Sequence, residues 1–182
     1  MAIIYLVRHG KAAASFTDDV DPGLDNLGNR QAEEVCESLL QKMPLAVLSS
    51  PLLRAKETAA PFVSKTKLSV NIENRMSEIP SPDLSLQERG AWLGVVMEGL
   101  WSEQSSSLQI WKHELAQCLL SIKSDTVIFS HFVAINAAVS LAENSDQVLI
   151  FRPDNCSITE IETDGTSLRL IRRGQEANTK VN

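Results

Sequence analysis

The sequence holds little that would suggest a membrane, secreted or nucleic-acid-binding protein. No apolar run approaches the roughly 20 residues that a membrane-spanning helix requires. Only three cysteines are present, an odd number without paired spacing, so we expect reduced thiols and a cytoplasmic location. Lys and Arg number 17 against 23 Asp and Glu, which gives a net charge of -6. This balance argues against a nucleic-acid binder, which normally presents a basic face.

The first residues also lack the features of a secretory signal. No basic segment precedes the apolar run, and the run meets Arg8 too early for a signal peptide. The 182 residues are enough for one ordinary domain, and their 43% hydrophobic and 22% charged content is typical of a globular protein. We therefore expect a single domain over residues 1–182, in which the polar stretch 174–182 forms a frayed tail.

Apolar strand patterns and amphipathic helix patterns alternate along most of the chain. We expect strands at residues 3–7, 45–48, 68–72, 126–129, 148–151, 157–161 and 167–171. Helices are expected at residues 25–43, where Pro44 ends the helix, and at 49–65, 108–122 and 132–141. The alternation predicts an α/β fold, a three-layer α/β/α sandwich with a mostly parallel sheet. Asp164-Gly165 is typical of a hairpin turn and predicts antiparallel edge strands near the C-terminal end of the chain.

Histidines and arginines follow three of these predicted strands. Arg8 and His9 come after the first strand, Arg54 lies a turn into the helix after the second, and His131 follows the strand at 126–129. Taken singly, each would be an ordinary loop or surface residue. Ligands of parallel sheets bind beyond the carboxyl ends of the strands, so we expect these four to converge. Arginine forks match phosphate oxygens, and a neutral imidazole can act as a nucleophile, so the pattern predicts a phosphoryl site.

Four blocks in this order resemble the histidine phosphatase superfamily, the phosphoglycerate-mutase-like proteins. The blocks are LVRHG at residues 6–10, LDNLGNRQA at 24–32, SSPLLRAKETA at 49–59, and Ser130-His131. In the second block Asp25 stands where threonine is common in the family. The resemblance implies that His9 is the nucleophile that becomes phosphorylated. It further implies that Arg8, Arg54 and His131 clamp the transferring group.

The resemblance also implies two further site residues and a lid. Ser15 stands where the family often has a phosphate-binding asparagine, and a loop turn is an equal alternative for it. Glu78 lies where the family carries its general acid, and the rival acids are Glu73, Glu57 and Glu88. Residues 73–111 are expected to form a lid insertion that selects the substrate. Tryptophans in this stretch either line the lid or pack in the core, and packing is favoured (Trp92, Trp101 and Trp111).

Some positions depart from the family pattern. Phe132 and Val133 follow the second histidine where glycine and a small residue are common, and this bulk either narrows the pocket or shifts backbone donors. Asn136 replaces a common arginine, and Lys11 stands where Glu or Gln is frequent. These departures leave the efficiency and the substrate open. The acidic residues of the first loop are interpreted as solvated rather than metal-binding (Asp18, Asp19 and Asp21).

Together these features predict a phosphatase that hydrolyses a phosphomonoester through a phosphohistidine on His9, without a metal or cofactor. The alternatives are a phosphoglycerate-mutase-type phosphotransferase, a protein phosphohistidine phosphatase, and a non-catalytic phosphate-ligand binder. The expected partner is a small phosphorylated substrate, with neither nucleic acid nor membrane. The oligomeric state is left open, with a dimer as one option.

Overall fold

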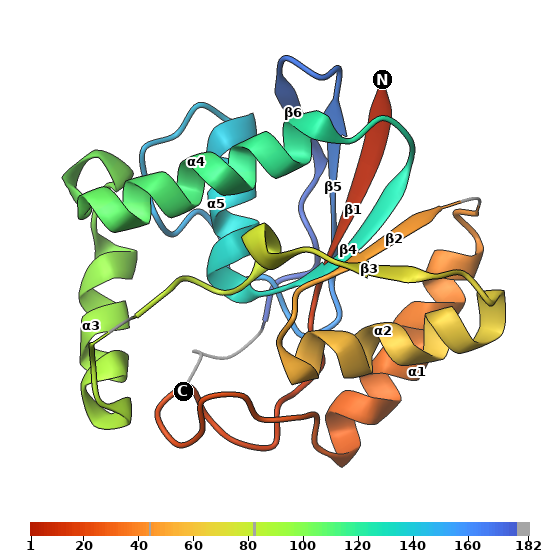
Figure 1. Cartoon of the computed structure of the whole chain (residues 1–182), viewed down its shortest axis with the longest axis horizontal. Coiled ribbons are helices and arrows are strands. Elements are labelled where there is room, and N and C mark those ends of the chain that lie inside the picture. Colours follow the sequence, from red (N-terminus) through yellow and green to blue (C-terminus); the bar gives the residue numbers. More distant parts are fainter. Residues whose placement is uncertain (44, 82, 178–182) are drawn as a thin grey trace.

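A six-stranded sheet forms the centre of the molecule, described here from a computed structural model over residues 1–43, 45–81 and 83–177 (Figure 1). The strands lie in the order β3-β2-β4-β1-β5-β6. Their bounds are β1 (Ala2–Arg8), β2 (Ala46–Ser49), β3 (Val70–Ile72), β4 (Thr126–Ser130), β5 (Ile158–Thr163) and β6 (Leu168–Arg172). All neighbouring pairs among β1 to β4 are parallel, whereas β5 and β6 join antiparallel. The predicted α/β fold with C-terminal antiparallel strands is confirmed.

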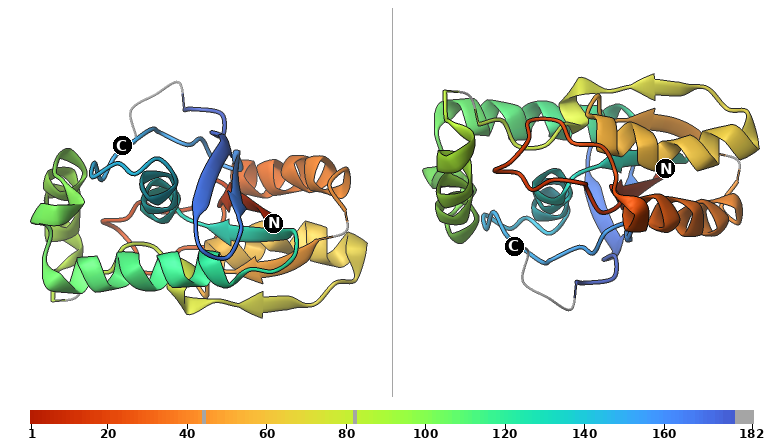
Figure 2. Two further views of the ribbon diagram at one scale, coloured as in Figure 1. Left: turned by 90° about the horizontal axis from the view of Figure 1, so that it is seen from above. Right: turned by 90° about the horizontal axis from the view of Figure 1, so that it is seen from below.

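Helices cover both faces of this sheet. Their bounds are α1 (Asn26–Leu40), α2 (Leu53–Thr66), α3 (Leu86–Glu98), α4 (Ser106–Ser121) and α5 (Phe132–Ala142), with single 3-10 turns η1 (Asn74–Met76) and η2 (Trp101–Glu103). Helices α1 and α2 lie on one face and α4 and α5 on the other, while α3 stands at the far end of α4, away from the sheet (Figure 2). None of the described helices is long and apolar enough to cross a membrane.

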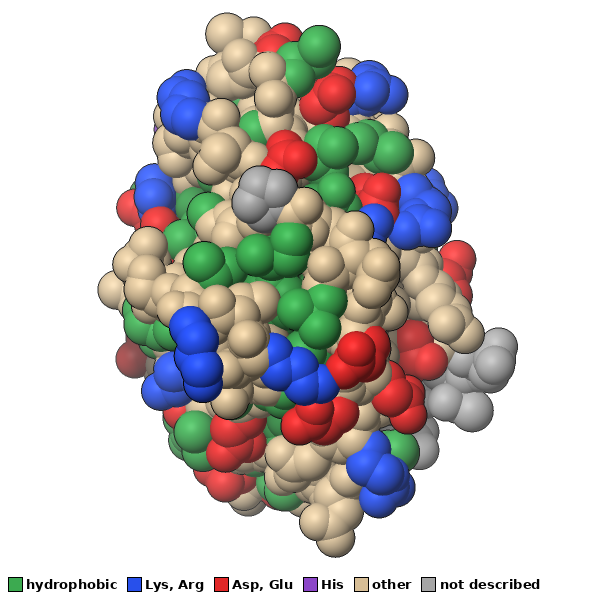
Figure 3. Space-filling model, turned by 90° about the vertical axis from the view of Figure 1, so that its right-hand side faces the viewer, with side chains coloured by type: hydrophobic (Ala, Val, Ile, Leu, Met, Phe, Trp, Pro, Cys, Tyr) green, Lys and Arg blue, Asp and Glu red, His purple; other side chains and the backbone are tan. Residues whose placement is uncertain are grey.

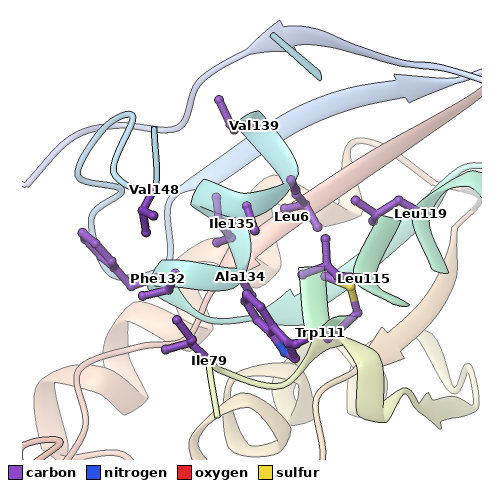
Figure 4. Close-up of a cluster of buried hydrophobic side chains, with 14 of the residues drawn as sticks. Leu6, Ile79, Trp111, Leu115, Leu119, Phe132, Ala134, Ile135, Val139 and Val148 are labelled. Atoms are coloured by element: carbon purple, nitrogen blue, oxygen red, sulfur yellow. The ribbon is translucent and has the colours of Figure 1, made fainter. Parts of the chain in front are cut away.

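The alternation of side chains along β1 divides the core in two. Ile4 and Leu6 pack among the residues of α4 and α5 (Figure 4), whereas Tyr5 and Val7 pack against α1 and α2. Helix α5 is buried from Phe132 to Ser140, which explains why its sequence lacks a polar face. On the face where α1 and α2 end, hydrophobic side chains gather between interspersed charges of both signs (Figure 3).

One predicted strand, at residues 148–151, does not form. The backbone N–H groups of Ile150 and Phe151 donate to Oδ1 of Asn136, at 2.8 and 3.1 Å, instead of to a neighbouring strand. The apolar pattern of this segment reflects burial of Val148 and Phe151 and not sheet pairing. Asn136, the departure from the family pattern, thus anchors this loop to α5.

Several predicted boundaries also shift. Helix α2 begins at Leu53 because Ser50 and Leu52 form a turn closed by a 3.2 Å bond from the Leu52 N–H to Ser50 Oγ. Helix α1 ends at Leu40, and the predicted stop at Pro44 lies outside the described residues.

Residues 174–177, at the start of the predicted frayed tail, make backbone hydrogen bonds. The backbone N–H of Asp154 donates to the Gln175 carbonyl at 2.8 Å, and the backbone N–H of Ala177 donates to the Arg152 carbonyl at 2.9 Å. These bonds hold the tail against the loop before β5. The rest of the predicted tail, residues 178–182, lies outside the described residues.

The stretch predicted as a lid contains η1, α3, η2 and the start of α4. Trp101 and Trp111 are buried with their rings 6.0 Å apart, and the half-buried Trp92 packs against the same core. The packing interpretation of the tryptophans therefore fits the structure. Whether this stretch acts as a lid stays a prediction.

Candidate active site

The two strand-end histidines lie side by side. His9 and His131 directly follow β1 and β4, which are adjacent parallel strands that pair Arg8 with Ser130. Their ring centroids are 5.2 Å apart, with an angle of 57° between the planes. The predicted convergence of these residues at the carboxyl edge of the sheet is therefore present in the structure.

Hydrogen bonds orient the buried ring of His9. Its Nδ1 lies 2.7 Å from the Gly10 carbonyl, and its Nε2 lies 3.2 Å from Nε–H of Arg54. Because Arg54 can only donate, Nε2 carries the lone pair and Nδ1 carries the proton. Burial lowers the pKa of His9 well below its usual value, and the charges of Arg54 and Arg8 lower it further. The ring is thus neutral, with its lone pair at Nε2 directed at the Arg54 guanidinium.

His131 is fully buried and held by the turn before α2. Its Nε2 lies 2.7 Å from Ser50 Oγ, which also accepts the N–H of Leu52 and so can donate its own proton to the ring. When Ser50 donates this bond, the His131 proton lies on Nδ1, which has no hydrogen-bond partner among the described residues. Burial lowers the pKa of His131 strongly, with further contributions from His9, Arg54 and Arg8. A neutral His131 can therefore offer an N–H to a phosphoryl oxygen.

Two guanidinium groups place positive charge around these rings. Arg54 is only 7% exposed, and its Nη1 lies 3.8 Å from Oδ1 of Asp21. Arg8 donates to the Pro153 carbonyl at 2.9 Å, and its Cζ lies 5.1 Å from the centroid of the Phe132 ring. Phe132, expected to narrow the pocket or displace donors, thus stacks on Arg8 and fixes its orientation.

Glu78 lies at the start of α5. Its carboxylate accepts N–H bonds from Ile79 at 3.0 Å, Val133 at 3.1 Å and Ala134 at 3.2 Å. Desolvation nevertheless raises the pKa of Glu78, while these bonds and Arg54 partly oppose the shift. Its negative charge in turn acts on both Arg8 and Arg54, which places the carboxylate within the same site.

The rival acids are engaged elsewhere. Glu73 pairs with Arg75 at 2.7 Å, Glu57 accepts the N–H of Leu24 at 2.6 Å, and Glu88 caps the start of α3. Glu78 is therefore the carboxyl group best placed for acid–base chemistry, and its role stays a prediction.

Close backbone packing explains the glycines of two motifs. A Cβ on Gly28 would lie 2.2 Å from the Lys11 carbonyl oxygen, and a Cβ on Gly10 would lie 2.6 Å from the Gly28 carbonyl oxygen. Only hydrogen fits at both positions, so the start of α1 packs directly against the loop that follows His9.

Two residues that hold this loop were not singled out from the sequence. The N–H of Gly10 donates to Thr58 Oγ1 at 3.0 Å, and Asn155 donates to the His9 carbonyl at 2.9 Å. Thr58 stands four residues after Arg54, so helical spacing could have placed it on the same side of α2. Nothing in the local sequence distinguishes Asn155.

The first loop differs in part from expectation. Ser15 bonds to Asp18 at 2.5 Å and Thr17 at 2.8 Å within its own loop, so its phosphate-binding role stays a prediction. Asp21 is not simply solvated, because its Oδ1 accepts the N–H of Leu53 at 2.8 Å beside Arg54. Across the described ranges, no group of three or more His, Cys, Asp and Glu side chains is arranged to hold a metal ion.

This arrangement of two neutral histidines, two arginines and a carboxyl group is suited to phosphoryl transfer. The chain belongs to the histidine phosphatase superfamily (branch 1), whose family model matches residues 4–176. The resemblance expected from the sequence is therefore confirmed.

Individual relatives share only a modest sequence identity with this chain. The chain is 25% identical to glucosyl-3-phosphoglycerate phosphatase of Mycobacterium tuberculosis, over 61% of this chain and about half of that protein (48%). It is 27% identical to the probable phosphoglycerate mutase GpmB of Erwinia tasmaniensis, over 89% of this chain and 85% of that protein. The structure of a mycobacterial glucosyl-3-phosphoglycerate phosphatase with inorganic phosphate shares the fold, with a TM-score of 0.77, 20% identity, and coverage of 99% and 100% of the two chains.

Proposed function

We propose that this protein is a phosphatase that hydrolyses a small phosphomonoester through a phosphohistidine intermediate on His9. One observation carries the proposal: the buried ring of His9 is neutral, with its proton fixed at Nδ1 on the Gly10 carbonyl and its lone pair at Nε2 directed to Arg54. A nucleophile needs that lone pair, and a phosphoryl group needs the neighbouring cation.

The first step transfers the phosphoryl group to His9. Nε2 forms a bond to phosphorus while the bond from phosphorus to the ester oxygen breaks. Protonated Glu78 gives its proton to the departing oxygen, so that an alcohol leaves. Arg8, Arg54 and the Nδ1–H of His131 bind the oxygens of the phosphoryl group, where negative charge is spread in the transition state.

The second step releases phosphate. A water molecule attacks the phosphorus, and the Glu78 carboxylate accepts one of its protons. The N–P bond breaks, and its electron pair returns to Nε2 of His9. Glu78 is then protonated for the next cycle, so the raised pKa of this group serves both steps.

A direct test replaces the proposed nucleophile. His9→Ala should abolish hydrolysis of 4-nitrophenyl phosphate, and the wild-type protein quenched during turnover should carry an acid-labile phosphoryl group on His9. The exposed His113 on α4 offers a matched control, because His113→Ala removes a histidine remote from the site. Phosphate recovered on another residue, or full activity of His9→Ala, would contradict the mechanism.

We further propose that the reaction needs no metal ion. The support is that Arg8 and Arg54 already supply positive charge beside the nucleophile. Activity should persist in EDTA and should be inhibited competitively by vanadate. Loss of activity on chelation, with recovery on adding a divalent ion, would refute this part.

A mutase activity is the second candidate, because the relative that is similar over 89% of this chain is a probable phosphoglycerate mutase. Incubation with 3-phosphoglycerate distinguishes the two reactions. A phosphatase releases inorganic phosphate, whereas a mutase forms the 2-phosphate isomer without release.

We also propose a cytoplasmic location. The support is that all three cysteines are free in the structure, namely Cys36, Cys118 and Cys156. Disulfides are typical of oxidising compartments.

A further inference from the structure

Arg89 on α3 links the two loops that border the candidate active site. Its Cζ lies 4.3 Å from the ring centroid of Phe16, and its Nε donates to Ser81 Oγ at 2.6 Å. Phe16 belongs to the loop that carries Asp21, which extends from the end of β1 toward α3 (Figures 1 and 2). Ser81 lies three residues after Glu78. Arg89 therefore contacts both the loop that touches Arg54 and the loop that carries the proposed acid.

The charge of Arg89 is not balanced by a neighbouring carboxylate. Within residues 1–43, 45–81 and 83–177, no Asp or Glu forms an ion pair with it, although the side chain is half-buried. It is also close enough to Arg54 to affect that residue: burial is the main cause of the lowered pKa of Arg54, and the charge of Arg89 lowers it further. Holding a second cation near the buried Arg54 costs stability unless an anion binds between them.

The contacts of Arg89 leave one edge of its guanidinium available. The ring of Phe16 takes a face of the planar group, and Ser81 takes its Nε. The two Nη atoms have no hydrogen-bond partner in the described part of the chain. Two parallel N–H donors are the arrangement that binds a carboxylate or a phosphate in bidentate fashion.

We propose that Arg89 is a specificity-determining residue that binds a second anionic group of the substrate, a carboxylate or phosphate carried by the organic part of the ester. This inference rests on the proposed function, because the first anionic group is the phosphoryl group bound by Arg8 and Arg54. The enzyme then prefers phosphate esters with a distal negative charge over neutral esters of the same shape. Stacking on Phe16 fixes the guanidinium before the substrate arrives, which reduces the entropy lost on binding.

The test compares two ligands that differ at one group. Glycerol 3-phosphate ends in a hydroxymethyl group where 3-phosphoglycerate has a carboxylate. Their inhibition constants against 4-nitrophenyl phosphate hydrolysis are measured in wild type, Arg89→Gln and Arg169→Gln. Arg169 is a matched control, since it is exposed on β6 and pairs with Glu162. We expect wild type and Arg169→Gln to favour 3-phosphoglycerate by about 10- to 100-fold, the size of a charge-assisted bond, and Arg89→Gln to lose this preference.

The outcomes separate this inference from the proposed function. Equal inhibition constants in wild type, or a preference that persists in Arg89→Gln, would overturn the role of Arg89. Equal weakening of both ligands would also overturn it, because Arg89 would then act only by packing on Phe16. If wild type fails to hydrolyse 4-nitrophenyl phosphate, the proposed function fails instead. In that case the dissociation constants of glycerol 3-phosphate and 3-phosphoglycerate are measured by calorimetry, and their ratio in wild type and in Arg89→Gln decides the role of Arg89.

Discussion

Glu78 offers the sharpest separation between catalysis and structure in this site. The substitution Glu78→Gln keeps a side-chain oxygen that can accept the hydrogen bonds from the N–H groups of Ile79, Val133 and Ala134. The backbone N–H groups at the start of α5 therefore keep their acceptor. The amide cannot give a proton to a leaving group. The variant therefore removes the proposed acid while preserving the local hydrogen bonds.

The size of the effect depends on the leaving group. An alkoxide needs a proton as it departs, and general acid catalysis contributes about 10²- to 10⁴-fold. A nitrophenolate is stable without one, so it needs the acid far less. Glu78→Gln should thus lower kcat/KM for glycerol 3-phosphate by about 10²- to 10⁴-fold and that for 4-nitrophenyl phosphate by less than about tenfold. The ratio kcat/KM is the quantity to compare, because it reports the transfer to His9, whereas the hydrolysis of the phosphohistidine is common to both esters.

The pH dependence gives a second measurement on the same variant. Because desolvation raises the pKa of Glu78, the acid is protonated to a higher pH than an exposed glutamate. The kcat/KM of wild type for the alkyl ester should fall as pH rises through that pKa, because the first step needs the protonated acid, and this fall should vanish in Glu78→Gln. Equal losses in kcat/KM on both esters, in a variant whose circular dichroism and unfolding midpoint match wild type, would refute the acid role of Glu78.

Three further outcomes follow from the site and its framework. Arg54→Ala should slow both esters alike, by about 10²- to 10³-fold, because Arg54 binds the phosphoryl group that they share; a loss confined to one ester would contradict this. Gly28→Ala should lower the free energy of unfolding by about 1–3 kcal/mol in urea titrations, because the new Cβ meets the Lys11 carbonyl; an unchanged midpoint would count against it. His9 and His131 stay neutral in the folded protein, because their pKa values are lowered, but take up protons in the unfolded chain below about pH 6.5. The free energy of unfolding should therefore decrease as pH falls below about 6.5, by up to about 1.4 kcal/mol per pH unit for each histidine. Urea titrations from about pH 7 to about pH 5 should therefore show a flatter dependence for the double variant His9→Asn, His131→Asn, and equal slopes would exclude this linkage.

The parts of the site that follow strands could be predicted from the sequence. Arg8, His9 and His131 stand at the ends of β1 and β4, whose apolar runs are easily recognised, and parallel pairing brings strand ends together. Arg54 could be placed because it stands one turn into the helix after β2.

The remaining features depend on contacts between distant parts of the chain. The pairing of Asn155 with the His9 carbonyl spans 146 positions, and no local pattern encodes it. The segment 148–151 is apolar enough for a strand, but its N–H groups bond to Asn136 on α5. The sequence places Asp21 among solvated acids, but its carboxylate accepts the Leu53 N–H once the first loop folds back on α2. Local propensity could not predict any of these contacts.

The position of β1 in the sheet has a consequence for biosynthesis. This first strand pairs with β4, where Ile4 meets Thr126, and with β5, where Ala2 meets Thr163. A ribosome must therefore synthesise the chain as far as β4, at residues 126–130 of 182, before β1 gains its first neighbour, and as far as β5 before it gains the second. Contacts of such long sequence separation slow folding and leave apolar strands exposed meanwhile. We expect the nascent protein to depend on chaperones more than its modest size suggests, and slower synthesis at low temperature to raise its yield.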